Sequence, residues 1–471
     1  MLWTANFTHG DLSESGSSIA QQPSEWQLSP VPASHSSRPS DHEYEHLPTI
    51  CGKPPSCSRQ AATAPLLVFH PHGGLMNSIF GLVSTALLAT ALCRRFALAW
   101  GQGSNAQALA SFSDLFRHPA GVAFLNLSAG ASVLAAAGGL TLEPSSRRNP
   151  TGLHRGLYNC TIEADPRYLG KSTQRSLARL SDHRDFWLDG DRDADRRLLS
   201  ACPVIHVRGN MYYVPLLQRN PRMAPAMRWM RARGLSCHNT DNKRPARSYS
   251  DDEPFFGAVS RHLLVPNSLL AGLADSALTY SPGVALIGIH VRSVLLLALH
   301  QTQQTSAKQS TARGVLKAYG FLDCIAMLRD SVARAAGYEA SKVYVAADNP
   351  DVHSDALELL GPSVVLPRPA HVFPPNERPR HMTTRRGQLA TGGALNEMLL
   401  LARMDGLIVW DLQDSTYSTA AASWATHRAA GQPLREESSR PWLGVHAVAN
   451  GCKRVPDALI EPGLPIPNVA V

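Results

Sequence analysis

From about residue 64 onward, short apolar runs alternate with longer helical segments. The first run, 64–70 (APLLVFH), leads into a turn with two glycines, then into an apolar stretch that ends at Cys93 and a second run at 94–100 (RRFALAW). A short, continuous apolar run is typical of a strand that is buried on both faces of a parallel sheet. The order strand, glycine turn, buried helix, strand therefore predicts a βαβ unit.

A second series of this kind begins after Pro282 and Gly283. Its predicted strands are 284–292 (VALIGIHVR), 342–348 (KVYVAAD), 363–369 (SVVLPRP) and 406–411 (GLIVWD), and its predicted helices are 312–337, a short one after 348, 393–404 and one from about 417. Strands that alternate with helices favour a parallel sheet covered on both faces. We therefore predict an α/β chain with two Rossmann-like domains, 61–280 and 281–471, that face each other across a cleft.

The other segments are less regular. Residues 1–60 are rich in Ser, Pro, Gln and His, which predicts a disordered tail or stem. A charged helical stretch covers about 170–200, a strand runs into a loop at 203–221, and 253–278 is helical with an interruption at Pro266. These last three segments complete the first predicted domain.

The charge of the chain favours a small anionic ligand over a nucleic acid. The 471 residues include 45 Lys and Arg against 37 Asp and Glu, a net charge of +8, but the basic residues are scattered in short pairs. Aromatic residues make up 7% and do not interleave with a basic stripe, as they would on a nucleic-acid surface. A basic site for a phosphorylated small molecule fits the same charge.

Eight cysteines, at positions 51, 57, 93, 160, 202, 237, 324 and 452, form no C-x-x-C pair, and no His lies at zinc-finger spacing. A structural zinc site is therefore not expected, and we predict no metal. The even count allows disulfides, with Cys51 and Cys57 as the nearest pair, and we interpret Cys93 and Cys324 as core thiols. Three N-glycosylation sequons, at Asn6, Asn126 and Asn159, give weak support for a secretory compartment.

The N-terminus shows no secretory signal, because residues 1–18 have neither a basic region nor an apolar core. Residues 75–93 are nineteen mostly apolar residues, about long enough to span a bilayer. Asn77, two Ser and two Thr lie within them, and strand-like runs lie on both sides. We interpret this segment as a buried core helix, with a membrane-embedded protein as the alternative.

In doubly wound sheets, ligands bind beyond the carboxyl ends of the strands. At the first such end, Gly73 and Gly74 let a ligand approach the backbone, and the helix N-terminus behind them favours anions. An ordinary βα turn is the alternative there. At the end of 284–292, His290 and Arg292 lie on the same side of the strand. The Arg292 guanidinium can hold a diphosphate with two hydrogen bonds, or it can pair with a neighbouring carboxylate.

Two more strand ends carry polar side chains. Asp348 can accept from a base or a ribose, or it can cap the following helix. Ser415, Thr416, Tyr417 and Ser418 offer hydroxyls and backbone N–H groups to phosphate oxygens, or they form an N-cap cluster. Glu397, on the preceding helix, is either an acid of the site or a surface residue. Together the four strand ends predict an anionic nucleotide-type ligand, with Arg292 at a phosphate.

At these same residues the chain resembles the plant xyloglucan fucosyltransferase-like family and, more distantly, the nodulation and α-1,6-fucosyltransferases. The similar stretches follow in family order from about residue 65 to 465: GGLMNSIFGLVSTALLATALCRRFALAW, FSDLFRHP, HVRGNMYYVPLLQRNP, FFGAVSRHLLVP, IGIHVR, VYVAADNPDV, ALNEMLLLARMDGLIVWDLQDSTYSTAA and CKRVPDALIEPGLPIP.

The resemblance implies a GT-B fold and inverting, metal-independent transfer of fucose from GDP-fucose, as a donor substrate rather than a cofactor, to a glycan hydroxyl. It implies that Arg292 binds the β-phosphate and that His290 lies beside the fucose. The other implied donor contacts are Asp348 and Glu397 at the nucleoside, Ser415, Thr416 and Tyr417 at the diphosphate, and Gly73, Gly74 and Asn77 closing the cleft from the other domain. On the acceptor side it implies His72, Asn210 and Tyr212.

Two positions depart from the family pattern. Met76 stands where the family turn has its second glycine, which would crowd the backbone. The segment after Arg292, SVLLLALH, has no carboxylate, so the α-1,6 branch's general base is missing there. A general base contributes on the order of 100- to 10,000-fold in rate, so a catalytically inactive relative that binds glycan or nucleotide is the alternative function.

The resemblance also implies a location in the Golgi lumen or membrane. The expected partners are the nucleotide-sugar donor and a glycan acceptor, such as a xyloglucan-type galactoside or a glycoprotein glycan. A homodimer is compatible with this interpretation, and a nucleic-acid partner is not expected.

Overall fold

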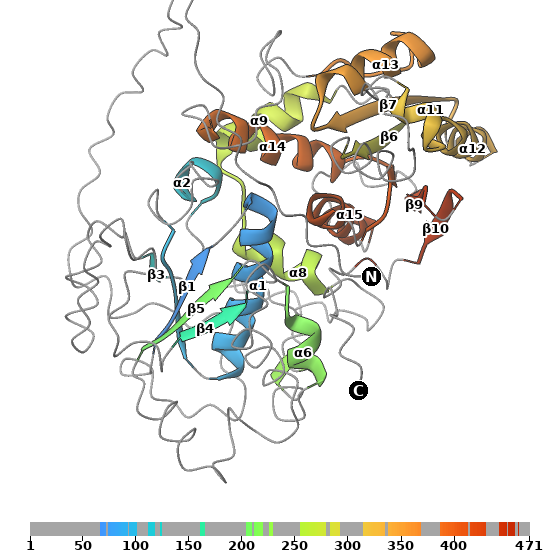
Figure 1. The fold of residues 1–471 in the computed structure, drawn as a ribbon. Helices are drawn as coiled ribbons and strands as arrows, with labels where there is room; N and C mark the ends of the chain where they lie inside the picture. The colour runs from blue at the N-terminus through green and yellow to red at the C-terminus, as the bar shows by residue number, and fades with distance from the viewer. Residues whose placement is uncertain are drawn as a thin grey trace, which may run out of the picture. The chain divides into compact units, whose positions relative to one another are not determined.

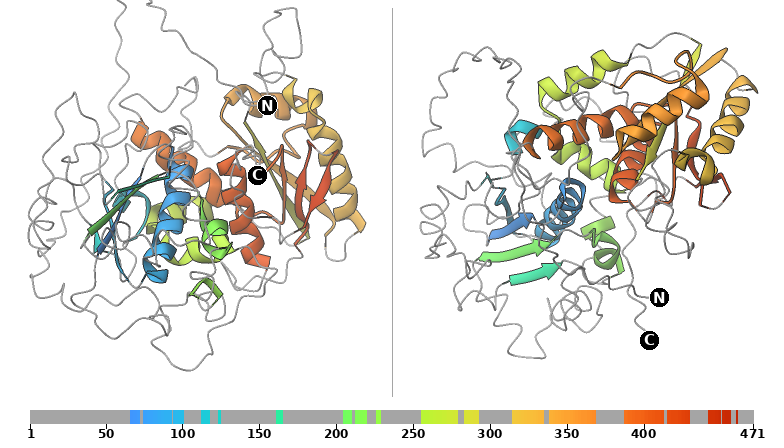
Figure 2. Two further views of the ribbon diagram at one scale, coloured as in Figure 1. Left: turned by 60° about the horizontal axis from the view of Figure 1, so that its bottom comes forward. Right: turned by 45° about the horizontal axis from the view of Figure 1, so that its top comes forward.

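A computed structural model of the chain shows two five-stranded sheets with helices packed on them (Figures 1 and 2). It describes residues 66–71, 74–92, 94–100, 112–117, 123–124, 161–164, 204–209, 212–219, 226–228, 255–278, 283–292, 314–334, 338–368, 387–412, 415–429, 442–449, 451–456 and 460. All of them belong to one compact unit, His46–Val471.

The first sheet has the strand order β3-β2-β1-β5-β4, and every described pair in it is parallel. Its strands are β1 (Leu66–Pro71), β2 (Arg95–Leu98), β3 (Ala123–Phe124), β4 (Thr161–Ala164) and β5 (Val204–Gly209). The helix α1 (Leu75–Ala91) connects β1 to β2. The predicted βαβ unit is therefore confirmed.

The second sheet has the order β10-β9-β8-β6-β7, and of its described pairs only β10–β9 is antiparallel. Its strands are β6 (Val284–Val291), β7 (Ala340–Ala347), β8 (Gly406–Val409), β9 (Gly444–Ala447) and β10 (Lys453–Val455). The connecting helices are α11 (Val315–Ala318), α12 (Phe321–Arg334), α13 (Pro350–Leu360), α14 (Gly387–Leu401) and α15 (Thr416–Ala429). Of the predicted strand 363–369, the structure describes residues 363–368, and among these only Val365 forms a bridge to the sheet, with Val343.

These two sheets confirm the α/β class and two Rossmann-like sheets, and the GT-B arrangement of the two halves stays a prediction. In each sheet the first strand in sequence lies inside the sheet. The next strand or strands are added on one side of it, and the later strands lie on its other side. β1 lies between β2 and β5, and β6 lies between β7 and β8. The carboxyl end of such a central strand is where α/β sheets bind ligands. The predicted cleft and the domain boundary at 280 stay predictions.

The remaining helices lie mainly between the sheets in sequence. They are α2 (Phe112–Leu115), α6 (Val214–Arg219), α8 (Phe255–Leu263) and α9 (Ser268–Ala277). Helix α8 packs on α1 and α15, and α9 packs on α14 (Figure 1). At the α8–α15 contact a Cβ on Gly257 would lie 2.3 Å from the carbonyl oxygen of Ser423, so this close approach requires glycine.

Alternation along β6 divides its side chains between two cores. Leu286 belongs to the larger core, which also contains residues of α1, α14 and α15. Ile287 and Ile289 belong to the second core, which also contains residues of α12 and α13. His290 follows the same alternation and faces the α14 and α15 side, because period-2 strands place residues two apart on one face.

The apolar segment at 75–93 forms the core helix that its flanking strands predicted. Its residues from Leu75 to Thr90 are buried, apart from the half-buried Asn77. Among the described helices, none combines the length and the apolar character that crossing a bilayer would require.

Several expectations fall outside the described residues. These are the tail at 1–60, the charged stretch at 170–200, and the cysteines Cys51, Cys57 and Cys93.

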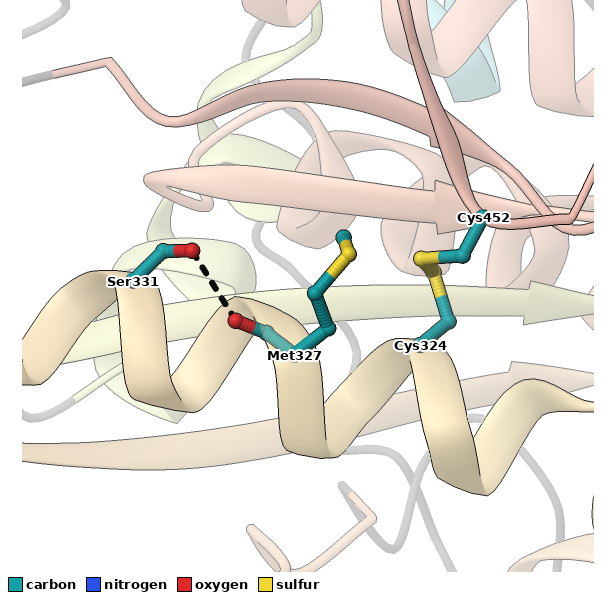
Figure 3. Close-up of a disulfide and its surroundings, with 4 residues drawn as sticks. All are labelled: Cys324, Met327, Ser331 and Cys452. Carbon is teal, nitrogen blue, oxygen red and sulfur yellow. Dashed lines mark hydrogen bonds between the residues drawn. A yellow bond between two sulfur atoms is a disulfide. The ribbon is translucent and has the colours of Figure 1, made fainter.

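The interpretation of Cys324 as a core thiol is wrong. Cys324 on α12 is bonded to Cys452, which lies in the turn between β9 and β10, with the two Cα atoms 5.2 Å apart (Figure 3). Cys324 is fully buried, as expected of a core thiol. The two cysteines are 128 residues apart in sequence, and it is the packing of α12 near the β9–β10 turn that brings them together.

The disulfide should stabilise the fold, because it restricts the unfolded chain over a long loop. Replacing both residues, Cys324→Ser with Cys452→Ser, should lower the free energy of unfolding by about 2–4 kcal/mol under oxidising conditions. Denaturant unfolding with and without dithiothreitol measures this, and the reduced wild type should lose most of its advantage over the double variant. Free thiols at both positions in the unreduced protein, detected by alkylation and mass spectrometry, would contradict the pairing.

Candidate functional site

Three strand ends of the second sheet meet at one edge. Val291 of β6 pairs with Ala347 of β7, so Arg292 and Asp348 follow at neighbouring strand ends. On the other side, His290 pairs with Val409 of β8, after which the chain leads into α15. The strand register therefore places these three ends at one edge of the second sheet.

His290 is held by two consecutive residues of α15. Its Nδ1 lies 2.6 Å from the Ser418 hydroxyl oxygen. Its ring stacks on the ring of Tyr417, with centroids 4.6 Å apart and planes inclined by 26°. The His290 side chain is 8% exposed. One face and one nitrogen of the imidazole are thus fixed by the protein.

The imidazole of His290 is neutral at physiological pH. Burial and, as the smaller cause, the positive charge of Arg292 together lower its pKa from 6.5 to about 3. Arg292 itself is exposed. The positive charge at this strand end therefore comes from Arg292, while His290 supplies a fixed neutral ring.

Ser415, the residue directly before α15, is the N-cap of that helix. The Ser415 hydroxyl accepts from the Ser418 N–H at 3.3 Å, and the Thr419 hydroxyl donates to the Ser415 carbonyl at 3.1 Å and to the carbonyl of Leu412. The N-cap alternative is thus correct for Ser415. The capped helix α15 begins at Thr416, and its N-terminus lies at the same edge of the sheet. A helix N-terminus favours anions.

Glu397 is an interior residue, 5% exposed, so the surface alternative is wrong. Its Oε1 accepts from Arg368 Nε at 2.9 Å and from the Tyr344 hydroxyl at 3.3 Å. Arg368 Nη2 lies 2.7 Å from the same oxygen and donates to the carbonyl of Ala347 at 2.8 Å. The nucleoside role that the resemblance implied for Glu397 stays a prediction, and its Oε1 is already bonded within the protein.

Burial controls the ionisation of this cluster. Desolvation raises the pKa of Glu397 from 4.5 to about 7, against the opposing charge of Arg368. Desolvation also raises the pKa of Tyr344 and of Tyr417 well above 10, and the negative charge of Glu397 adds to both shifts. Both tyrosines therefore keep their hydroxyl protons, and the Tyr417 hydroxyl donates a hydrogen bond to the Ala394 carbonyl at 2.7 Å.

Two polar residues, Asp348 and Asn349, follow the carboxyl end of β7, and they differ in their contacts. The Asn349 side chain caps α13 by accepting from the Asp351 N–H at 2.9 Å. The helix is therefore capped by Asn349 and not by Asp348, for which a capping role was the alternative. Asp348 is half-buried, and its charge raises the pKa of Glu397 slightly further.

At the first sheet, Gly74 is the N-cap residue of α1, and as a glycine it has no side chain to accept from the first N–H groups of the helix. A Cβ on Gly74 would meet no atom within 4 Å. Asn77, in the first turn, is half-buried, and its Oδ1 accepts no hydrogen bond within the described part of the chain. Met76 is 5% exposed and belongs to the large core, so its side chain is accommodated there.

The acceptor-side residues receive little support. His72, Gly73 and Asn210 lie outside the described residues. Tyr212 is 3% exposed and packs edge-on against Phe256, with ring centroids 5.4 Å apart. A role for Tyr212 toward an acceptor stays a prediction that its burial does not favour.

Sequence reasoning missed Arg368 and Tyr344. Arg368 is the one charged residue of the run SVVLPRP, and a charge that closes an apolar run is the signal that pointed to Arg292. Tyr344 lies in β7 among apolar residues and offers no such signal. Among the residues with described positions, no group of three or more His, Cys, Asp or Glu side chains is placed to hold a metal ion, and metal-independent chemistry stays a prediction.

Comparisons with known proteins give structural similarities only. No protein-family model matches the chain, and no curated protein matches it. A mutant of Arabidopsis thaliana FUT1 in complex with GDP is 15% identical, with a TM-score of 0.44 over 78% of this chain and 70% of that one. Fucosyltransferase NodZ from Bradyrhizobium is 15% identical, with a TM-score of 0.42 over 84% and 99%.

POFUT1 in complex with GDP-fucose is 12% identical, with a TM-score of 0.38 over 78% of this chain and 95% of that one. These identities and TM-scores are too low to assign the chain to a family or to transfer an activity to it.

The raised pKa of Glu397 predicts a specific pH dependence of stability. The folded protein keeps the Glu397 proton up to about pH 7, whereas the unfolded chain releases it near pH 4.5. The contribution of this proton to the free energy of unfolding is therefore fully present below pH 4.5 and is lost as the pH rises through about 7. Glu397→Gln removes the titration. The melting temperature of the wild type minus that of the variant should therefore fall from pH 4.5 to 7 and stay level above.

Thermal unfolding in a buffer series from pH 4.5 to 8.5 measures this difference. A difference that is constant over the whole range, or that grows with pH, would show that Glu397 is ionised throughout.

Proposed function

We propose that the protein is a glycosyltransferase that moves fucose from GDP-fucose to a hydroxyl of a glycan. The observation that supports this most is the neutral His290, which contacts the first turn of α15 and lies close to the exposed Arg292. These residues lie at the carboxyl ends of the parallel strands of the second sheet, which is where α/β sheets bind ligands. The resemblance of the surrounding sequence motifs to fucosyltransferases supplies the donor and the reaction.

A diphosphate suits this edge for electrostatic reasons. Arg292 offers a planar set of N–H donors, and charge-assisted hydrogen bonds of this kind contribute about 1.5–3 kcal/mol each. The N-terminus of α15 adds backbone N–H donors and the positive end of the helix dipole. The half-buried Thr416 is the first residue of that helix.

The proposed reaction breaks the bond between the fucose anomeric carbon and the β-phosphate oxygen. Negative charge grows on that oxygen in the transition state, where Arg292 and the α15 N-terminus stabilise it. The acceptor hydroxyl oxygen bonds to the anomeric carbon from the opposite face, which inverts its configuration. These cationic groups would take the part that a metal ion plays elsewhere, and we propose metal-independent transfer.

His290 is a poor candidate for a general base, because a group with a pKa of about 3 holds a proton weakly. We propose instead that its fixed ring contacts the fucose. The acceptor proton can leave late, after the bond to GDP has lengthened, and no base is assigned to it.

The acceptor and the location follow from the resemblance. We propose a cell-wall galactoside or a glycoprotein glycan as the acceptor, and the Golgi lumen or membrane as the location. The Cys324–Cys452 disulfide supports a lumenal site, because disulfides persist in oxidising compartments. Intact-mass analysis of the protein isolated from its host would count against this location if the two thiols were free.

A catalytically inactive relative that binds the nucleotide or a glycan is the second candidate. The observation in its favour is that residues 293–300, directly after Arg292, contain no carboxylate. A nucleotide-binding relative would bind GDP and would not turn over GDP-fucose.

Thermal shift with GDP, UDP and CMP tests the donor site. GDP at about a hundred times its dissociation constant should stabilise the wild type by roughly 2.7 kcal/mol, and the other nucleotides should stabilise it less. Arg292→Ala should weaken GDP binding about 10- to 100-fold. Arg334→Ala is the matched control, because this exposed arginine ends α12 near the amino end of β7, at the opposite edge of the sheet.

Incubation of GDP-fucose with a galactoside acceptor then separates the two candidates, with the fucosylated product detected by mass spectrometry. A GDP-selective shift without product would favour the inactive relative. No shift with any nucleotide would contradict the transferase and the nucleotide-binding relative, and would leave a relative that binds a glycan.

A further inference from the structure

Arg368 connects two elements of the second half of the chain. Its guanidinium contacts Glu397 on α14 through Nε and Nη2, at 2.9 and 2.7 Å, and donates from Nη2 to the carbonyl of Ala347 at 2.8 Å. Ala347 is the last residue of β7 and directly precedes Asp348. One side chain therefore ties α14 to the carboxyl end of β7.

The same face of α14 connects to His290. Ala394 lies three residues before Glu397, and its carbonyl accepts from the Tyr417 hydroxyl at 2.7 Å. The Tyr417 ring stacks on His290, and the next residue, Ser418, lies within hydrogen-bond distance of Nδ1. A continuous chain of contacts thus runs from Arg368 through α14 to the imidazole.

Stability alone is a weak reason to keep such a pair. Arg368 and Glu397 have side chains only 11% and 6% exposed, and replacing a buried ion pair by apolar residues is often neutral or stabilising. A planar guanidinium that contacts both a carboxylate and a carbonyl does, however, fix the relative position of the elements that carry them.

We propose that Arg368 and Glu397 are positioning residues of the donor site, which fix the β7 end and, through α14 and Tyr417, the orientation of His290. This inference rests on the proposed function. Neither residue needs to contact the nucleotide, and their effect is transmitted through Ala347 on one side and Ala394 on the other.

Arg368→Lys is the sharpest test, because it keeps the positive charge opposite Glu397 and loses the planar fork. Calorimetric titration with GDP should show affinity lowered about 2- to 30-fold. Arg329→Lys is the matched control: Arg329 is also half-buried and also donates from Nε to a side chain, Ser341, but it lies on α12, and the change should leave GDP affinity within twofold of wild type.

A double-mutant cycle distinguishes positioning from a general loss of structure. Tyr417→Phe removes the hydroxyl that bonds Ala394. If Arg368 acts through α14 and Tyr417, the two substitutions disturb the same contacts. The fold-loss of GDP affinity in the double variant should then be at most about half the product of the fold-losses of the two single variants. Independent structural effects would multiply.

The outcomes separate the two claims. If wild type binds no GDP, the proposed function fails and this inference fails with it. If wild type binds GDP while Arg368→Lys equals the Arg329 control, or while the cycle shows multiplied losses, the inference alone is overturned. Should Arg368→Lys fold poorly, Glu397→Ala, which removes the oxygen that accepts from Arg368, takes its place in the same cycle, with the same expected sign.

Discussion

The parallel pairing of β6 with strands on both sides is the constraint on which the rest of the site depends. Because β7 and β8 run in the same direction as β6, their carboxyl ends lie along one edge. Polar residues that are more than a hundred positions apart in the chain, such as His290 and Ser418, thereby become neighbours. Strand alternation then turns His290 toward α15 and its isoleucine neighbours toward the other core.

This geometry assigns different tasks to buried and exposed groups. Taking His290 and Glu397 out of water shifts both toward their neutral forms, as the directions of their pKa shifts show. The exposed positive charge at the end of β6 belongs to Arg292, whereas the Arg368 guanidinium at the end of β7 is bonded to Glu397 and the Ala347 carbonyl. A site of this kind can hold its shape without a ligand and still offer a cation and a helix N-terminus to an anion.

The sequence predicted the strands β1, β2, β5, β6, β7 and β8, because continuous apolar runs mark strands that are buried on both faces, whereas the predicted strand 363–369 contributes an isolated bridge at Val365. His290, Arg292 and Asp348 were found in this way. Long-range contacts were not predictable: Cys324 and Cys452 are 128 residues apart, and nothing local pairs them. The same holds for Arg368 and Glu397, whose contact depends on how α14 packs against β7. Strands as short as β3 and β10 carry too few residues for any pattern to show.

A crystal structure of the protein with GDP-fucose bound tests the central claim most directly. The account predicts the diphosphate at the N-terminus of α15 with Arg292 in hydrogen-bond contact, and the fucose beside the His290 ring, which keeps its stack on Tyr417. A nucleotide bound at another edge of the fold, or a diphosphate at this edge without contact to Arg292, would contradict it.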